Sequence, residues 1–286
     1  MCECYRCAVP NFVGYYSPSP IVITLRRQNR GLMIPDAPTR EIQSVRTAFR
    51  VVTTIQQQDG ATLHELTERL DLAKSTVHNY LGTLESLGYV VEADGSYRLG
   101  LRFLTHGMAA RNGVAPREAV TAVLPEIAEA IARPAWWVVE EFGRGIFVER
   151  AVPDEAAETY GRVGKRSYLH THAPGKAMLA TLPQDSVSRV VERHGLPALT
   201  GKTTTDVETL RADLETIRER GWAVSEGEAA LCVQSIGVAF RARGTVHALG
   251  VFGYSGDFSR NTLEDDVPSL LRDAVADIDS ALEAAG

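Results

Sequence analysis

Hydrogen-bonding side chains gather at the start of one predicted helix, in the segment that begins at residue 74. Asparagine amides pair bidentately with adenine, serine and threonine hydroxyls reach bases or phosphates, and lysine neutralises phosphate. These chemistries suit an exposed helix that enters the major groove of DNA and reads base edges with its N-terminal residues. The residues that we assign to this role are Lys74, Ser75, Thr76, His78, Asn79 and Tyr80.

Three arginines are candidates for contact with the DNA backbone. Arg46 and Arg50 lie on a helix predicted for residues 44–58, and Arg98 lies on a predicted hairpin. Basic and acidic side chains are nearly balanced over residues 40–105, although phosphate neutralisation usually makes DNA-binding domains basic. We therefore expect the acidic side chains to face away from the duplex. A winged helix used for protein contacts is the alternative.

The apolar spacing before residue 74 predicts two helices that pack together. In the first, apolar side chains recur at three- and four-residue steps and form one stripe: Val45, Ala48, Val51, Val52 and Ile55. Thr62 and Glu65 have the spacing of a capping box, so a second helix begins after Thr62. Its apolar face contains Leu63, Leu66 and Leu70.

The third helix is predicted over residues 76–87, with Ser75 as its N-cap. Its buried face consists of Val77, Leu81, Leu84 and Leu87. Two short strands, 89–92 and 97–99, follow around Asp94-Gly95, which is the turn chemistry of a tight hairpin. Three helices followed by a hairpin is the order of a winged helix-turn-helix.

A second set of useful groups lies in the segment Ala173-Pro174-Gly175-Lys176. A helix that begins here points backbone amides at a carboxylate or a phosphate, the groups that helix N-termini bind. The alternative is that Gly175 serves a tight turn and that Lys176 is a solvated charge.

Metal and nucleophile chemistry are both disfavoured. His170, His172 and Cys232 are the minimum for a zinc site, but Cys232 is distant in sequence, so we expect core or pocket residues. Cys2, Cys4 and Cys7 have no later pair to complete a tetrahedral site. Nothing marks a base or an oxyanion site for Cys232. We therefore predict no catalytic residue, no metal ligand and no cofactor.

The chain has 286 residues, a length that suggests two domains. Its formal net charge of −6 excludes the class of basic proteins that coat nucleic acid. No apolar run approaches the ~20 residues of a membrane span. There is no disulfide framework, so we expect a cytoplasmic protein. Residues 1–39 hold three of the four cysteines without periodicity, and we interpret them as a disordered tail or a mis-assigned start upstream of Met33.

Several motifs, in order, resemble the IclR family of regulators. In the N-terminal part they are GATLHELT (60–67), LAKSTVH (72–78), LGTLESLGYV (81–90) and YRLG (97–100). In the C-terminal part they are LHTHAPGKAMLA (169–180), HGLPALT (194–200) and TTTD (203–206). The family commonly has Arg at the position of Asn79, and Gly and Pro where this chain has 229–232 and 239–240.

The resemblance implies an α+β fold: a winged helix-turn-helix at residues 40–105, then a linker helix and a GAF-like sensing domain with an antiparallel sheet at residues 106–286. It implies a homodimer, with a dimer of dimers as a further assembly, that binds a double-stranded DNA operator and a small organic or aromatic acid. The effector residues it suggests are Ala173, Pro174, Gly175, Ser225, Ser235, Gly253 and Ser255.

The patterning after residue 100 agrees with such a domain. The predicted helices are 101–111, 116–132, 175–182, 185–194, 206–220 and 263–284, and the predicted strands are 136–141, 145–152, 235–240 and 246–254. The function we expect is a ligand-responsive regulator that represses a catabolic operon. The alternatives are an enzyme with an accessory winged helix and a DNA-binding protein without an effector.

Overall fold

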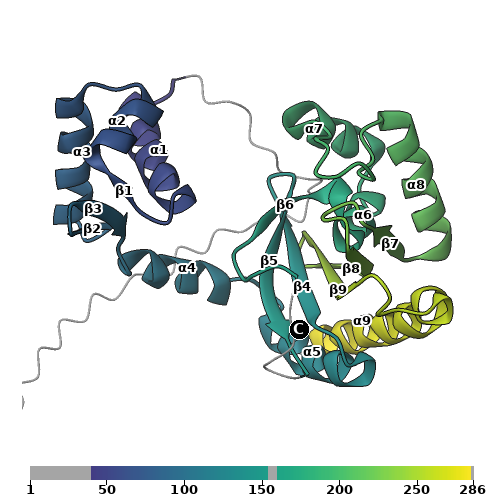
Figure 1. Ribbon diagram of the computed structural model, residues 1–286. Coiled ribbons are helices and arrows are strands. Elements are labelled where there is room, and N and C mark those ends of the chain that lie inside the picture. Colours follow the sequence, from purple (N-terminus) through teal and green to yellow (C-terminus); the bar gives the residue numbers. More distant parts are fainter. Residues whose placement is uncertain (1–39, 154–159, 285–286) are drawn as a thin grey trace, which may run out of the picture.

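The computed structural model describes residues 40–153 and 160–284, so the predicted tail at residues 1–39 lies outside the described residues. Two domains stand apart in Figure 1 and are joined by the helix α4 (Arg102–Asn112). The N-terminal domain has three helices and a small sheet, and the C-terminal domain has a larger sheet with helices on both faces. Within the described ranges no helix is both long enough and apolar enough to cross a membrane.

The N-terminal domain is built from α1 (Gln43–Gln57), α2 (Leu63–Leu70) and α3 (Lys74–Ser86). The predicted capping box at the start of α2 is present, since Thr62 and Glu65 each accept from the other's backbone amide. The helices and the small sheet enclose one core, which consists of Val51, Ile55, Ala61, Leu66, Leu70, Val77, Leu81, Val90 and Tyr97.

The buried stripe of α1 differs from the predicted one in its first turn. Val45 is 52% exposed, whereas Thr47 is buried in line with Val51 and Ile55. Residues four apart lie on one face of a helix, so Thr47 continues the stripe and Val45 does not. The prediction failed because it followed apolar residue type and passed over a threonine.

Helix α3 begins earlier than predicted, and Ser75 is not its cap. Ala73 occupies the N-cap position without a side-chain hydrogen bond, and Lys74 is the first helical residue. Ser75 therefore lies in the first turn, where its side chain is exposed. At the other end Leu87 is exposed rather than buried, because the helix has already ended at Ser86.

The small sheet has three antiparallel strands in the order β1-β3-β2, with β1 at Ala61–Thr62, β2 at Val90–Ala93 and β3 at Ser96–Leu99. Asp94 and Gly95 connect β2 to β3 with φ angles of 52° and 75°, as a type I′ turn requires. The hairpin was predicted, whereas β1 is too short to show an alternating pattern.

The C-terminal domain is organised around a six-stranded antiparallel sheet in the order β6-β5-β4-β9-β8-β7. The strands are β4 (Ala135–Glu141), β5 (Arg144–Ala151), β6 (Arg166–Tyr168), β7 (Ala223–Glu226), β8 (Val233–Ala242) and β9 (Thr245–Tyr254). The sequence predicted the four central strands. The edge strands β6 and β7 were missed because such short segments carry little periodicity.

Helices cover both faces of this sheet (Figure 1). One side, here called the α6 face, carries α6 (Ala173–Ala180), α7 (Gln184–His194) and α8 (Val207–Arg220). The other side, the α9 face, carries α5 (Arg117–Ile131) and α9 (Val267–Ala284). Short helical turns lie at Leu169–Thr171 and Thr262–Asp266.

Neighbouring tryptophans of β4 show how one sheet serves two cores. Trp136 and Trp137 are both fully buried, but Trp136 belongs to the core of the α6 face and Trp137 to the core of the α9 face. Successive side chains of a strand point to opposite faces, so the pair anchors both layers.

Helix α6 lies directly on the sheet because two glycines leave room for it. A Cβ atom at Gly237 would lie 2.6 Å from the backbone nitrogen of Pro174, and one at Gly250 would lie 2.2 Å from Pro174 Cγ. Any side chain at either position would push the first turn of α6 away from β8 and β9. The glycines thus fix the depth at which the loop before α6 is held.

Candidate functional site

The predicted DNA-reading residues divide into an outer and an inner group on α3. Lys74, Ser75, His78 and Asn79 are exposed, whereas Thr76 and Tyr80 are half-buried and Tyr80 packs against the domain core. On the opposite side Val77 and Leu81 are buried. The exposed group therefore forms a polar strip along the first two turns, which is the part of a recognition helix that meets base edges.

The three arginine candidates have different surroundings. Arg50 Nη2 donates a hydrogen bond to the carbonyl oxygen of Leu70 at 2.9 Å, so this guanidinium joins α1 to the end of α2. Arg46 forms an ion pair with Glu41 at 3.1 Å. Arg98 is exposed on β3. Of the three, Arg50 has the clearest structural role. Arg98 is the only one of the three on the β2–β3 hairpin, which is the wing of the winged helix.

On the α6 face, His172 caps α6 and determines the hydrogen bonds before it. Its Nδ1 accepts from the amide of Gly175 at 3.1 Å, and its Nε2 lies 2.6 Å from Ser167 Oγ. Because Nδ1 accepts, Nε2 carries the proton and donates to Ser167, which in turn donates to the carbonyl of Gly145 at 3.1 Å. Complete burial lowers the pKa of His172 to about 3, so the ring is neutral.

This arrangement gives Ser167 no general base. In an activated serine the histidine accepts the hydroxyl proton, whereas here the histidine donates to the hydroxyl. Ser167 is also buried. The chain from His172 through Ser167 to Gly145 therefore fixes the loop instead of activating a nucleophile.

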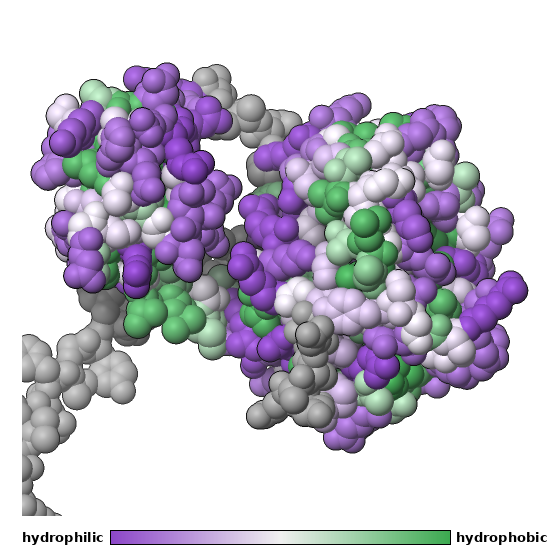
Figure 2. Space-filling model, viewed as in Figure 1, coloured by the Kyte–Doolittle hydropathy of each residue, from purple (hydrophilic) through white to green (hydrophobic). Residues whose placement is uncertain are grey.

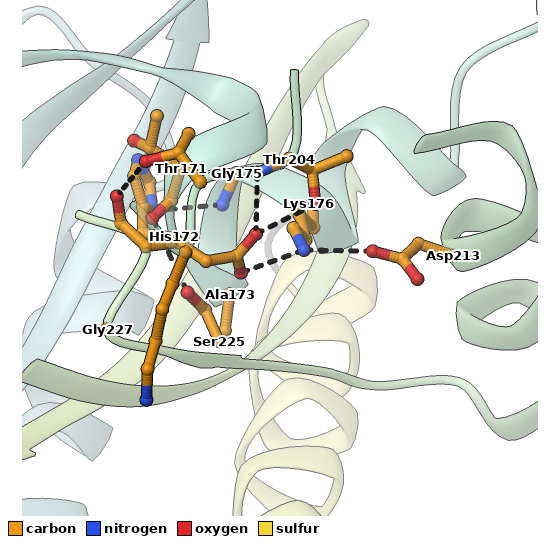
Figure 3. A network of polar contacts seen from close by, with 12 residues as sticks. Thr171, His172, Ala173, Gly175, Lys176, Thr204, Asp213, Ser225 and Gly227 are labelled. Atoms are coloured by element: carbon orange, nitrogen blue, oxygen red, sulfur yellow. Dashed lines mark hydrogen bonds and ion pairs between the residues drawn. The ribbon is translucent and has the colours of Figure 1, made fainter. Parts of the chain in front are cut away.

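Four of the predicted effector residues lie together in this region, which Figure 3 shows in part. The amide of Ala173 donates to Ser235 Oγ at 3.1 Å, and Ser225 Oγ donates to the carbonyl of Thr171 at 3.4 Å. Together with Gly175, whose amide is taken by His172, these groups are already paired within the protein. The amides of Ala173 and Gly175, which we expected to point at an anion, therefore have acceptors within the protein, and their role toward an effector stays a prediction.

The remaining effector candidates are not brought to this cluster as a set. Pro174 lies against the sheet, as described above. A Cβ atom at Gly253 would lie 2.7 Å from Phe258 Cε2, which belongs to the α9 face, so Gly253 faces away from the others. Ser255 is exposed beyond the end of β9. The family resemblance suggested these two residues, but Gly253 lies on the opposite face of the sheet from Ser235, and Ser255 follows the end of β9.

Lys176 is buried, which excludes the expected alternative of a solvated charge. Its side chain is 5% exposed, and its Nζ lies 2.8 Å from Glu228 Oε2 and 3.0 Å from Asp213 Oδ2 (Figure 3). Thr204 Oγ1 donates to the other carboxylate oxygen of Glu228 at 3.1 Å. This network connects α6, α8 and the loop before β8. No local pattern in the sequence joins Lys176 to Glu228.

An aromatic cluster on the α6 face was also missed. The ring of Phe147 lies 5.1 Å from Trp136 and 5.6 Å from Phe252, and Tyr160 stacks on Phe252 at 5.4 Å. Lys165 Nζ lies 3.7 Å above the Tyr160 ring. Burial, with a smaller contribution from Arg162, lowers the pKa of Lys165 to about 8. The guanidinium of Arg150 lies 5.6 Å from the centre of the Trp136 ring, so the cluster combines aromatic rings with two cations.

One donor in this cluster has no acceptor. Trp136 Nε1 is buried and makes no hydrogen bond with any residue that the structure describes. Buried polar atoms are nearly always paired, so an orphaned donor needs an explanation. A ligand with an acceptor group is one such explanation.

Two sequence-family models match the chain in the order of its two domains. The IclR helix-turn-helix domain matches residues 44–94, and the bacterial transcriptional regulator IclR C-terminal domain matches residues 117–280, more than half of the chain. The chain belongs to the IclR family of transcriptional regulators. This membership excludes the alternative of an enzyme with an accessory winged helix, because the named relatives are regulators.

Individual relatives agree with the IclR assignment. The probable HTH-type transcriptional regulator ArcR of Halobacterium salinarum is 30% identical over 252 residues, which cover 86% of this chain and 96% of the relative. The transcriptional repressor IclR of Escherichia coli is 25% identical over 214 residues, which cover 72% of this chain and 77% of the repressor.

Solved IclR structures share the fold. An IclR transcriptional regulator from Alicyclobacillus acidocaldarius has a TM-score of 0.71 at 26% identity, and the match covers 84% of this chain and 99% of that one. An IclR homolog from Microbacterium hydrocarbonoxydans, solved in complex with 4-hydroxybenzoate, has a TM-score of 0.68 at 24% identity, with 84% and 99% covered.

The metal alternatives raised by the sequence gain no support from the IclR fold. Both ring nitrogens of His172 are engaged, and His170 Nε2 lies 3.2 Å from the carbonyl oxygen of Pro197. Cys232 is exposed. In the ranges 40–153 and 160–284 no three His, Cys, Asp or Glu side chains are grouped as metal ligands. The N-terminal cysteines Cys2, Cys4 and Cys7 lie outside the described residues.

Proposed function

We propose that this IclR-family chain is a dimeric, ligand-responsive repressor that reads an operator with α3. The observation that carries this proposal is the division of α3: Val77 and Leu81 hold the helix to the domain core, which leaves Lys74, His78 and Asn79 exposed on its first two turns. A recognition helix needs this combination of a fixed back and a polar front. Arg98, which is exposed on β3, is the residue that we propose to contact the DNA backbone.

The test is operator affinity, measured by fluorescence anisotropy on a duplex selected by the purified protein from a random-sequence library. Replacing Thr76 and Asn79 by Ala should weaken specific binding about tenfold or more, since a good bidentate base contact contributes about 1–3 kcal/mol. Gln57→Ala, an exposed change at the far end of α1, is the matched control. Specific binding that survives both changes on α3 would refute the assignment.

Exposed apolar side chains support a dimer through the N-terminal half. Figure 2 shows apolar surface where the N-terminal domain passes into α4. At this junction Leu101 is 85% exposed, and Leu104 and Met108 of α4 are exposed as well. Exposed apolar side chains also occur in the first half of α1, where Phe49 is 62% exposed, together with Ile42 and Val45. A second copy is the occupant we propose, since a dimer presents two recognition helices to two half-sites.

Sedimentation of the purified chain tests the dimer. Phe49→Asp combined with Leu104→Asp should convert dimers to monomers, whereas Leu199→Asp, at an exposed apolar residue of the C-terminal domain, should not. A dimer that persists in the double variant would move the interface elsewhere. A dimer of dimers is the larger assembly that we propose for the C-terminal domains.

We propose that the effector is a small organic or aromatic acid bound on the α6 face. The aromatic rings of Phe147 and Tyr160, the ammonium of Lys165 and the orphaned donor Trp136 Nε1 together support an aromatic carboxylate. Of the predicted effector residues, Ala173, Pro174, Gly175, Ser225 and Ser235 line the neighbouring α6 start, while Gly253 and Ser255 have the weakest support.

Thermal shift with 4-hydroxybenzoate, benzoate, pyruvate and the neutral benzamide tests the effector class. A bound ligand stabilises the folded chain as its concentration exceeds the dissociation constant. We expect a carboxylate to raise the melting temperature and benzamide not to do so. If none of these ligands changes the melting temperature at concentrations up to about 10 mM, a DNA-binding protein without an effector of this class is favoured.

The regulated genes are proposed to form a catabolic operon that the protein represses in the cytoplasm. The support is the named repressor among the relatives. A reporter fused to the selected operator should gain expression when the regulator gene is deleted. Loss of expression on deletion would make the protein an activator.

A further inference from the structure

Strand β5 contains a bulge at the point where the linker helix meets the C-terminal domain. Phe147 pairs with Val138 and Glu149 pairs with Trp137, so Val148 is an extra residue in β5. A bulge of this kind re-aims neighbouring side chains. Phe147 points into the aromatic cluster on the α6 face, whereas Val148 packs in the core of the α9 face.

The residues of the bulge contact both the linker helix α4 and the helix that follows it, α5. Arg111, in the last turn of α4, donates from Nε to the carbonyl oxygen of Val148 at 3.1 Å and forms an ion pair with Glu149. Arg117, the first residue of α5, donates from Nη2 to the same Glu149 oxygen at 2.9 Å. The Glu149 side chain is 15% exposed, so both contacts are shielded from bulk water.

The other end of α4 is held by the N-terminal domain. Tyr89 OH lies 2.7 Å from His106 Nε2, and the Tyr89 ring lies 4.9 Å from Phe103. Arg102 donates to the carbonyl oxygen of Leu87, the residue that follows α3. Between these ends α4 has no buried side chain in the part of the chain that the structure describes. Within one chain, packing along its length therefore does not fix its direction, and the contacts at its ends are the ones that hold it.

We propose that Glu149 is a positioning residue that couples the α6 face to the DNA-binding domain through α4. This inference rests on the proposed function, because it assumes that ligand and DNA bind at opposite ends of the chain. Phe147 is the neighbour of Val148 in the bulge and contacts Trp136, Phe252 and the ring of His172. A ligand that displaces Phe147 shifts the bulge, and Arg111 transmits the shift to α4.

The test is hydrogen exchange of the full-length chain, read by mass spectrometry, in wild type and in Glu149→Gln. The substitution keeps the shape but removes the charge that two guanidinium groups share. Asp257→Asn is the matched control, because it removes another half-shielded carboxylate–arginine pair, with Arg133, that does not touch α4. We expect amides of residues 102–112 to exchange at least tenfold faster in E149Q and within twofold of wild type in D257N.

A second measurement separates coupling from mere stability. When the selected duplex is added to the wild type, exchange should slow both in α3 and in residues 144–151 of β5. In E149Q it should slow in α3 alone. Arg111→Met, which removes the partner on α4, should reproduce the result if E149Q does not fold.

Two outcomes would overturn the inference. One is unchanged exchange of α4 in E149Q and R111M, which would mean that something other than Glu149 fixes the helix. The other is a β5 response to DNA that survives in both variants. If no duplex is selected at all, the proposed DNA-binding function fails, while the exchange of α4 still decides whether Glu149 positions the linker.

Discussion

Breaking the buried ion pair of Lys176 should destabilise the C-terminal domain more than the loss of any exposed pair. Lys176 Nζ lies between Glu228 at 2.8 Å and Asp213 at 3.0 Å, and of these two acids only Asp213 has a substantially exposed side chain. Removing one member of a buried pair leaves an uncompensated charge and costs about 3–5 kcal/mol. Lys176→Met leaves Glu228 buried with only hydroxyl and amide donors from Thr204, so we expect a cost of about 3 kcal/mol.

The two single variants and the double variant together isolate the pair. Glu228→Gln should cost less, about 2 kcal/mol, because Lys176 keeps Asp213 as a partner. The double variant K176M/E228Q leaves no buried charge, so its cost should fall about 2–3 kcal/mol short of the sum of the single costs. A double-mutant cycle measured by urea unfolding, followed by circular dichroism, gives this coupling energy.

The control is Arg211→Met, which removes an exposed pair with Glu208 on α8 and should cost no more than about 1 kcal/mol. For a chain of this size K176M should lower the melting temperature by roughly 6–12 °C. Additive costs in the cycle, or a K176M cost no larger than that of R211M, would refute the view that Lys176 is held by a buried pair.

Three further predictions concern single sites. Burial raises the pKa of Glu140 to about 7 from an ordinary value of 4.5, so the folded chain binds this proton more tightly than the unfolded chain does. The stability that comes from this tighter proton binding is fully present below pH 4.5 and is lost as pH rises through about 7. Glu140→Gln should therefore stabilise the fold by up to about 3 kcal/mol at pH 8 and give no gain at pH 4 in thermal melts; equal gains at both pH values would contradict the burial argument. Gly237→Ala should destabilise by at least about 1–3 kcal/mol because its Cβ meets Pro174, whereas Gly107→Ala on α4 meets nothing within 4 Å and should be neutral or stabilising. Thr62→Ala removes the N-cap of α2 and should cost about 1 kcal/mol in the unfolding of the N-terminal domain; an unchanged transition would show that the cap is dispensable.

Features encoded by neighbouring residues were predicted well. The capping box at Thr62 and Glu65 and the turn at Asp94-Gly95 each depend on a few consecutive positions. The order of the helices, the hairpin and the four central strands followed from periodicity for the same reason. The errors in the buried stripe of α1 and in the start of α3 arose because a polar residue, Thr47, occupies a buried position, and because α3 begins without a side-chain cap from Ser75.

Features made by distant residues were not predicted. Lys176 meets Glu228 only because α6 lies under the loop before β8, and no local pattern joins the two positions. The aromatic cluster draws Trp136, Phe147, Tyr160 and Phe252 from separate segments, so it exists only once the sheet has formed. The acceptor of the Ala173 amide, Ser235, is also distant in sequence, whereas the acceptor of the Gly175 amide, His172, is the local N-cap of α6.

The distribution of tryptophan gives the protein an internal optical probe. The chain has three tryptophans, at positions 136, 137 and 222, and all of them lie in the C-terminal domain. Trp136 and Trp137 lie in the cores on opposite faces of the sheet, so their fluorescence emission is sensitive to the packing on both sides of β4. The winged helix contributes no tryptophan emission. A change in tryptophan emission when DNA is added would therefore detect, without any label, a structural change in the C-terminal domain that is coupled to DNA binding through α4.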